Sequence, residues 1–357
     1  AVFPTGGTTG KSKGVVLNHR SVFTMCQNFY AHFNYHDETC HLVVAPMTHS
    51  AGIIGSLHFA RGGTNVVMSN AAPDLICDAI DKYRVSHLFL PPTVVYMMLA
   101  LPDVKDRDYS SLQHFLVGAA PTSVEKLKEA VSVFGPVMTE AFGQSEAPAA
   151  ITAKAPWDYI DKDGNINERR LASIGRPCVN NRVAILDEDG TELKRGHAGE
   201  ICIQGDLVSP GYYKNPEATA EVRQFGWHHT GDVGVMDDEG FITIVDRKKD
   251  MIISGGFNVF PNEVEQVLNS HPAVQDCAVI GVPDEKWGEA VNAIVQLKAA
   301  HECSEETLIA LCKRELGGVK APKSVEFVDD LPRSSAGKVL KTELRKKHWE
   351  GRERAVN

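Results

Sequence analysis

The feature that most constrains the fold is an alternation of short apolar runs with helix-like segments between residues 15 and 151. The runs at 42–44, 64–68, 87–90 and 114–117 read as strands, and the segments 72–83 and 123–133 have helical character. Strands that alternate with helices in this way are typical of a largely parallel sheet. We therefore predict an α/β domain over residues 1–172.

Two later sections have different patterns. Residues 173–248 contain short strands at 182–186, 200–204 and 241–245, separated by acidic, glycine-containing turns, which predicts a β-barrel-like subdomain. Residues 249–357 alternate strands with two helices, one starting with Pro261 and one capped by Ser304. The predicted class is α/β plus α+β: a large N-terminal domain of αβ sheets, carrying the β-barrel-like subdomain, and a small mobile C-terminal α+β domain. Because the chain opens within a strand, we expect part of the N-terminal domain to be absent.

The composition excludes several functions. A net charge of −9 and a pI near 5.9 argue against a nucleic-acid surface. The longest apolar stretch, 88–101, is interrupted by two prolines and falls short of the roughly 18 residues that a membrane span needs. Eight cysteines without metal-like spacing indicate reduced thiols in a cytoplasmic protein. We interpret His228 and His229 as a solvated turn rather than a metal site, since no third ligand is suitably spaced.

A loop rich in glycine, threonine and lysine follows the first strand. Glycines let backbone N–H groups converge on phosphate oxygens, while hydroxyls donate and lysines add charge. A Walker A loop is disfavoured, because only three residues separate Gly6 from Gly10 and the next segment, 15–17, reads as a strand. We predict a phosphate loop in a hairpin, with these candidate residues: Thr5, Gly6, Gly7, Thr8, Thr9, Gly10, Lys11 and Lys13.

Further motifs occur in a recognisable order along the chain. They are Gly-Ala-Ala-Pro at 118–121, Thr-Glu-Ala-Phe-Gly-Gln-Ser-Glu at 139–146, Trp-His-His-Thr-Gly-Asp at 227–232, Ser-Gly-Gly-Phe-Asn at 254–258 and Pro-Arg-Ser-Ser-Ala-Gly-Lys at 332–338. With the loop, they resemble the adenylate-forming superfamily of acyl-CoA synthetases, peptide-synthetase adenylation domains and beetle luciferases. The loop departs from that pattern at Gly6, where a serine is usual, and at Ser12, where a proline is usual.

The resemblance implies a role for each candidate. Glu146 is the Mg²⁺ ligand, Ser145 contacts the α-phosphate, and Asp232 binds the ribose hydroxyls with Arg247 beside it. Lys338 is the catalytic lysine, and His49 lies near the acyl carboxylate. Lys249 is the hinge on which the small domain turns. The walls of the nucleotide and acyl sites comprise Gly118, Ala119, Ala120, Pro121, Ala141, Phe142 and Gly143, and the pantetheine tunnel comprises Gly255, Gly256, Phe257 and Asn258.

The function predicted from this resemblance is an ATP-dependent acid–CoA ligase. It adenylates a carboxylic acid, releases pyrophosphate and transfers the acyl group to the thiol of coenzyme A, with Mg²⁺ as the metal. Small residues at 148–150 suggest a roomy apolar acyl tunnel. Three alternatives stay open: loading of a carrier-protein phosphopantetheine, a luciferase-like oxygenase, and a non-catalytic binding fragment. We expect no nucleic-acid partner and leave open a homodimer, as well as the choice between a fatty, aromatic or ring-bearing acid.

Overall fold

The computed structural model describes residues 1–5, 13–33, 35, 38–48, 50–120, 122–333 and 339–350 of the 357-residue chain. The described residues form two compact units, which are treated separately. The first contains those of 1–230 together with 235–243, and the second contains 231–234 and 244–350. The division into three parts at 172 and 248 stays a prediction.

A seven-stranded sheet organises the first unit, in the order β4-β3-β5-β6-β7-β8-β9. The pairs from β4 to β7 are parallel, and β8 and β9 are added antiparallel. This confirms the predicted α/β sheet. Its strands are β3 (Cys40–Val43), β4 (Thr64–Val67), β5 (His87–Leu90), β6 (His114–Val117), β7 (Met138–Gln144), β8 (Ala147–Lys154) and β9 (Arg176–Pro177).

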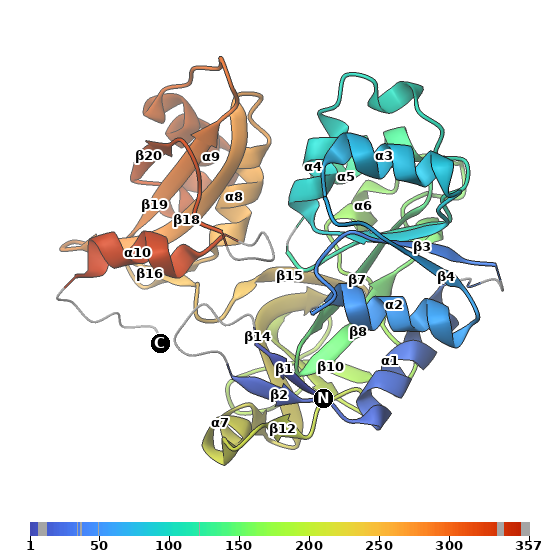
Figure 1. Ribbon diagram of the computed structural model, residues 1–357. Helices are drawn as coiled ribbons and strands as arrows, with labels where there is room; N and C mark the ends of the chain where they lie inside the picture. The colour runs from blue at the N-terminus through green and yellow to red at the C-terminus, as the bar shows by residue number, and fades with distance from the viewer. Residues whose placement is uncertain are drawn as a thin grey trace. The chain divides into compact units, whose positions relative to one another are not determined.

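Helices cover both faces of this sheet, as Figure 1 shows. On one face lie α3 (Pro73–Lys82), α4 (Pro92–Leu99) and α5 (Val124–Phe134), and on the other α1 (His19–His32) and α2 (Ser50–Ala60). The apolar stretch 88–101 divides at its two prolines: it completes β5 and then starts α4, with Pro92 in the first turn. Each face therefore has its own apolar core, one with α3, α4 and α5 and one with α1 and α2.

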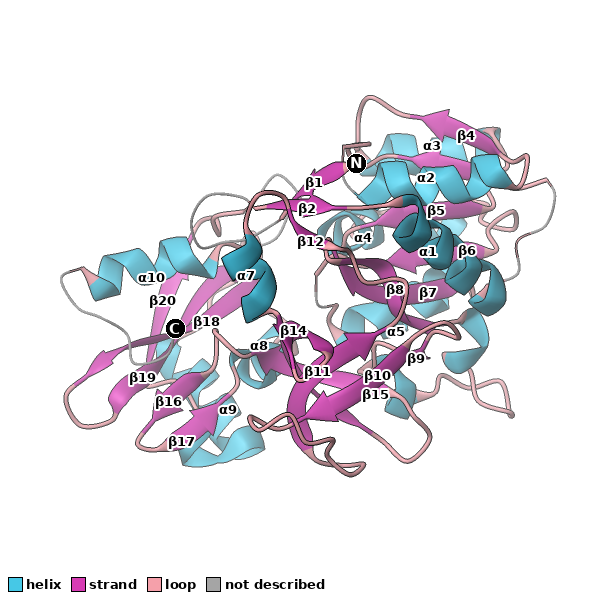
Figure 2. Cartoon of the chain, turned by 90° about the horizontal axis from the view of Figure 1, so that it is seen from below, coloured by secondary structure: helices cyan, strands magenta, loops and turns pink. Residues whose placement is uncertain are grey.

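Two smaller sheets complete the strand-rich part of the chain (Figure 2). A three-stranded sheet contains β1 (Val2–Pro4), β2 (Gly14–Val16) and β12 (Gly211–Tyr212). A five-stranded sheet contains β10 (Arg182–Leu186), β11 (Ala198–Gln204), β13 (Arg223–Gln224), β14 (Trp227–Met236) and β15 (Ile242–Arg247). The short helix α7 (Pro216–Glu221) lies between β12 and β13, while α6 (Glu168–Leu171) lies between β8 and β9 of the seven-stranded sheet.

The second unit is an α+β structure, as predicted. Its sheet comprises β16 (Ile252–Ser254), β17 (Phe257–Val259), β18 (Val274–Asp284), β19 (Gly288–Leu297) and β20 (Ser324–Val328). Its helices are α8 (Pro261–Asn269), α9 (Glu305–Lys320) and α10 (Lys341–Trp349).

The two predicted helices of this unit begin where expected. Pro261 starts α8, and the Ser304 hydroxyl accepts a hydrogen bond from the backbone N–H of Thr307 at 3.3 Å at the start of α9. The third helix, α10, packs through Leu344 in a separate apolar cluster. Among all the helices that the structure describes, none has the length and apolar character to cross a membrane.

Candidate active site

The two ends of the predicted phosphate loop meet at the base of the β1–β2 hairpin. The backbone N–H of Lys13 donates to Thr5 Oγ1 at 3.0 Å, and the N–H of Thr5 donates to the Lys13 carbonyl at 2.8 Å. A strand, β2, follows the loop, so the interpretation as a hairpin rather than a Walker A loop is confirmed. The loop candidates between these ends, Gly6, Gly7, Thr8, Thr9, Gly10 and Lys11, lie outside the described residues.

Ser145 and Glu146 lie in the turn between β7 and β8, beside the loop's base. The Ser145 hydroxyl donates to the Pro4 carbonyl at 3.3 Å. The Tyr212 hydroxyl donates to Glu146 Oε1 at 2.6 Å, and the Lys13 ammonium lies 5.0 Å from the centre of the Tyr212 ring. The structure thus gathers a carboxylate, a cation and a hydroxyl at one place.

Tyr212 is the residue of this group that sequence reasoning missed. It belongs to β12, which pairs with β2, and it lies 66 residues from Glu146 in the chain. Burial, and then the hydrogen bond to Glu146, raise the pKa of Tyr212, so the phenol stays protonated and donates. No local pattern in the sequence marks this tyrosine; only the strand pairing brings it to the site.

The candidates for the site walls lie at the carboxyl ends of β6 and β7. A Cβ on Gly118 would lie 3.4 Å from the Ala141 carbonyl, so these two residues are neighbours. A Cβ on Gly143 would lie 2.5 Å from the Ala149 nitrogen, which explains why glycine is needed there. Ala119, next to Gly118, has a left-handed φ of 71°. Ala120 follows it, while Pro121 and the acyl-site candidate His49 lie outside the described residues.

The start of the 139–146 motif is fixed by a buried lysine. Lys154 is fully buried and pairs with Glu140, and its ammonium also donates to three carbonyls at 2.7–3.1 Å: those of Arg170, Leu171 and Ser173. The Tyr159 hydroxyl donates to the same glutamate at 2.8 Å. This network, which sequence reasoning also missed, ties β7 to β8 at the open end of their hairpin, opposite the turn that carries Glu146.

The candidates in the second unit fall into two groups. Asp232 is 6% exposed, and Arg247 Nε lies 3.3 Å from its Oδ1, so the two side chains form an ion pair. Lys249 lies in the turn after β15, where burial lowers its pKa. The pantetheine-tunnel candidates form the tight β16–β17 turn, in which Gly255 and Gly256 have positive φ and Phe257 and Asn258 are exposed. Lys338 lies outside the described residues.

The interpretation of His228 and His229 as a solvated turn is wrong. Both residues belong to β14; His228 is 3% exposed, and burial lowers its pKa to about 3. His229 Nδ1 lies 3.1 Å from Glu200 Oε2 and 3.4 Å from Cys202 Sγ, and the three ligand atoms lie within 4.8 Å of one another. The neighbouring strand β11 therefore supplies metal-ligand types that spacing along the sequence did not reveal.

Taken unit by unit, these groups have the chemistry that adenylation needs. A single carboxylate beside a phosphate loop suits Mg²⁺, which binds proteins through one or two carboxylates and completes its shell with substrate phosphates and water. The ion pair of Asp232 gives a buried acceptor for hydroxyl groups. A hairpin beside the carboxyl edge of a parallel sheet, with a glycine-, threonine- and lysine-rich loop sequence and a separate α+β unit, is the combination expected of adenylate-forming enzymes.

Comparison with known proteins identifies the family. The AMP-binding enzyme family matches residues 1–213, and the AMP-binding enzyme C-terminal domain matches residues 263–338. The chain belongs to the AMP-binding enzyme family, and the resemblance to the adenylate-forming superfamily is confirmed.

Its relatives include CoA ligases. The medium/long-chain-fatty-acid–CoA ligase FadD8 of Mycobacterium tuberculosis is 41% identical over 99% of this chain and 62% of the relative. A feruloyl-CoA synthase of Amycolatopsis sp. is 36% identical over 96% of this chain and 68% of the relative. The chain thus spans about three fifths of the length of FadD8.

Solved structures with the same fold are also similar to this chain. The amide bond synthetase McbA from Marinactinospora thermotolerans has a TM-score of 0.89 and 33% identity, covering 97% of this chain and 69% of McbA. The o-succinylbenzoate CoA synthetase MenE from Bacillus subtilis, in complex with its acyl-adenylate, has a TM-score of 0.85 and 29% identity, covering 96% of this chain and 68% of MenE.

Proposed function

We propose that this chain forms the nucleotide-binding and thiol-transfer parts of an ATP-dependent acid–CoA ligase. The observation that carries the proposal is the cluster of Lys13, Tyr212 and Glu146 at the base of the hairpin loop. It supplies the cation and the metal-binding carboxylate that a triphosphate requires. The printed names of the relatives, fatty-acid–CoA ligase and feruloyl-CoA synthase, support coenzyme A as the acceptor.

In the first step, a carboxylate oxygen attacks the α-phosphorus of ATP. An oxygen–phosphorus bond forms, the bond to pyrophosphate breaks, and pyrophosphate leaves with the electron pair. Mg²⁺ held by Glu146 would offset the negative charge on the phosphates. The loop of residues 5–13, Ser145 and Lys338 act as donors to the same oxygens, while Asp232 and Arg247 hold the ribose. The attacking carboxylate is already ionised at neutral pH, so no general base is required.

In the second step, the thiol loses its proton and its sulfur attacks the acyl carbon, and AMP leaves with the electron pair of the broken carbon–oxygen bond. We assign the loop of residues 255–258 to the thiol channel, because its glycines leave room for a pantetheine arm. Lys249 is the assigned hinge between the two reaction states, at the proposed boundary between residues 173–248 and 249–357. Eight free cysteines support a cytoplasmic setting, and a homodimer stays an open alternative.

The test is ATP–pyrophosphate exchange by the full-length protein with a broad panel of carboxylic acids. Glu146→Gln and Lys338→Ala should each lower exchange by about 10²–10³-fold, because each removes charge stabilisation of the transition state. Glu188→Gln, on an exposed turn, is the matched control and should leave exchange unchanged.

The outcome separates the alternatives. If no acid in the panel supports exchange, the ligase function is refuted and a binding fragment is favoured. If exchange occurs, the acceptor is identified by supplying coenzyme A, a carrier-protein pantetheine or an amine and weighing the product by mass spectrometry. Product only with the carrier protein or the amine would refute coenzyme A as the acceptor.

A further inference from the structure

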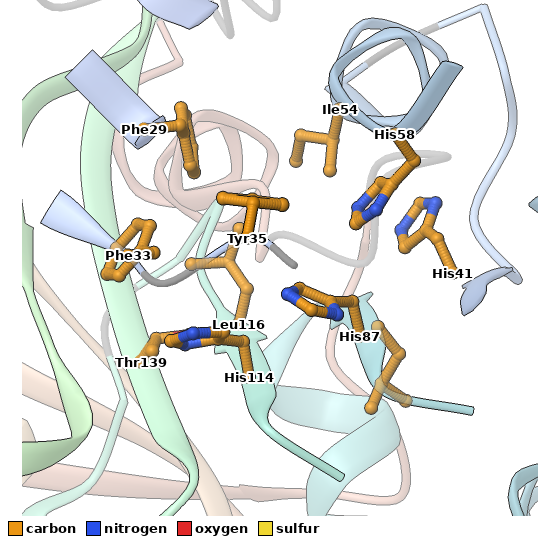
Figure 3. A pocket seen from close by; sticks show the side chains of 11 residues that line it. Phe29, Phe33, Tyr35, His41, Ile54, His58, His87, His114, Leu116 and Thr139 are labelled. Atoms are coloured by element: carbon orange, nitrogen blue, oxygen red, sulfur yellow. The ribbon is translucent and has the colours of Figure 1, made fainter. Parts of the chain in front are cut away.

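Four buried histidines gather in the first unit, away from the residues discussed so far (Figure 3). They are His41 on β3, His58 on α2, His87 on β5 and His114 on β6, and none is more than 7% exposed. Successive ring centres lie 4.3, 4.9 and 5.0 Å apart. Strand register aligns three of these residues, since His41 pairs with His87 and His87 with His114.

These histidines line a small cavity in an otherwise apolar layer. The other lining side chains are Phe29, Phe33, Tyr35, Ile54, Leu88, Leu116 and Thr139. The space is on the scale of one water molecule. Burying imidazoles among phenylalanine and leucine side chains is costly unless their nitrogens are hydrogen-bonded. His58 Nδ1 lies 3.1 Å from Thr39 Oγ1 and His87 Nδ1 lies 2.8 Å from Ser86 Oγ, so the need for a polar group in the cavity rests on His41.

The hydrogen bonds of His41 indicate which kind of group the cavity would bind. The Asn65 amide donates to the Gly55 carbonyl at 3.0 Å, which orients its Oδ1 towards His41 Nδ1 at 2.7 Å. His41 therefore carries its proton on Nδ1 and a lone pair on Nε2, and this buried nitrogen has no hydrogen-bond partner among the described atoms. A hydrogen-bond donor in the cavity would satisfy it.

The cavity favours a neutral donor over a cation or an anion. Burial lowers the pKa of His41 to about 4 and that of His58 to about 3, so both rings are uncharged at neutral pH. Among the described residues that line the cavity, none is acidic and none is a lysine or an arginine. A hydroxyl group matches these properties, because it is water-sized and can both donate and accept a hydrogen bond.

The cavity lies at the opposite end of β6 from the candidate active site. From His114 at the start of the strand to Gly118 beyond its end there are four residue steps, or roughly 13 Å at about 3.3 Å per residue. One apolar cluster spans this distance. It contains Phe29, Ile54 and Leu116 from the cavity, and Phe142 and Ala149 from the site walls.

We propose that the histidine-lined cavity is a subsite for the hydroxyl group, alcoholic or phenolic, at the far end of the acid substrate. The inference rests on the proposed ligase function. The carboxylate of the acid lies at the Gly118 end of β6, its apolar body lies against the α1 and α2 layer once those side chains part, and its hydroxyl donates to His41 Nε2. The enzyme then selects hydroxy acids whose carboxylate and hydroxyl are roughly 16 Å apart, because His41 lies two strands, or about 10 Å, across the sheet from His114. It discriminates against acids that end in a methyl group.

The experiment compares kcat/KM in pyrophosphate exchange for pairs of acids that differ only in a terminal hydroxyl or methyl group, over lengths that bracket that span. The unmodified full-length protein should prefer the hydroxy acid by about tenfold or more, because a methyl group leaves a buried acceptor unpaired. His41→Phe and His58→Phe should erase most of this preference. His19→Phe, an exposed histidine at the start of α1, is the matched control and should retain it.

Three outcomes are informative. If methyl-ended acids are used equally well or better by the unmodified protein, the subsite is overturned while the ligase function stands. If no acid supports exchange, the ligase function fails and the subsite fails with it. Thermal unfolding checks that each variant is folded. If neither phenylalanine variant folds, Thr139→Val, which changes the same cavity without altering an imidazole, takes their place, and an unchanged preference would overturn the subsite.

Discussion

Replacing Glu140 by glutamine should destabilise the first unit strongly. Lys154 is fully buried, and Glu140 is its counter-charge; three backbone carbonyls complete the surroundings of the ammonium. Removing one partner of a buried ion pair costs about 3–5 kcal/mol, since the remaining charge is left uncompensated. That is a large share of the roughly 5–15 kcal/mol that stabilises an ordinary domain. At about 2–4 °C per kcal/mol for a domain of this size, Tm should fall by roughly 6–20 °C.

The assay is urea and thermal unfolding of four proteins: the unmodified chain, Glu140→Gln, Lys154→Met and the double variant. The double variant should be more stable than the sum of the two single changes predicts, because it leaves neither charge buried alone. A loss below about 1 kcal/mol for Glu140→Gln would refute the reasoning, since a cost that small is typical of an exposed pair. Additive losses would show that Lys154 is held by the carbonyls and not by the carboxylate.

Acid should destabilise the first unit through the buried histidines. The pKa values of His41 and His58 lie at about 4 and about 3 in the folded chain against 6.5 ordinarily, and the facing groups are His87, His114 and Tyr35. As pH falls, the unfolded chain binds protons on these histidines before the folded chain does. Their contribution to the free energy of unfolding is therefore fully present above pH 6.5 and is lost as pH falls towards about 4 for His41 and about 3 for His58. The urea midpoint should therefore drop between about pH 7.5 and about pH 5, and drop less in His58→Phe; equal drops would contradict this assignment. Gly175→Ala should cost more stability than Gly164→Ala. Both glycines have positive φ, but only at Gly175 would a Cβ meet backbone, at 2.0 Å from the Ala153 carbonyl. Gly164→Ala, the control, should lower the free energy of unfolding by about 1–2 kcal/mol, the cost of a left-handed alanine. Equal losses for the two variants in urea unfolding would contradict the predicted clash.

The elements that sequence predicted well are those with a local physical signal. β5 and β6 each consist of a histidine followed by three apolar residues, every position is buried, and their bounds match the prediction. The starts of α8 and α9 carry a proline and a capping serine. Helix α2 was missed because its residues are apolar nearly all round and include two glycines, so no helical stripe of polar and apolar residues marks it.

The candidate site was predicted only as far as its motifs extend. Glu146, Thr5 and Lys13 were found because each lies in a short string of characteristic residues. Tyr212 and Lys154 were missed because their partners depend on which strands become neighbours: β12 joins β2, and β8 pairs with β7. Strand order is a property of the whole sheet, and no window of sequence around either residue contains it.

The same dependence on register explains the histidines. His87 and His114 each open a strand of four residues, and a one-residue slip of either strand would turn its histidine to the other face of the sheet. β5 and β6 are parallel and of equal length, so they align at both ends. The register that gathers the imidazoles at the amino end also places Gly118, just after β6, beside Ala141 of β7. The two ends are therefore set by one alignment. The length of these strands would therefore set the length of a substrate that reaches from one end to the other.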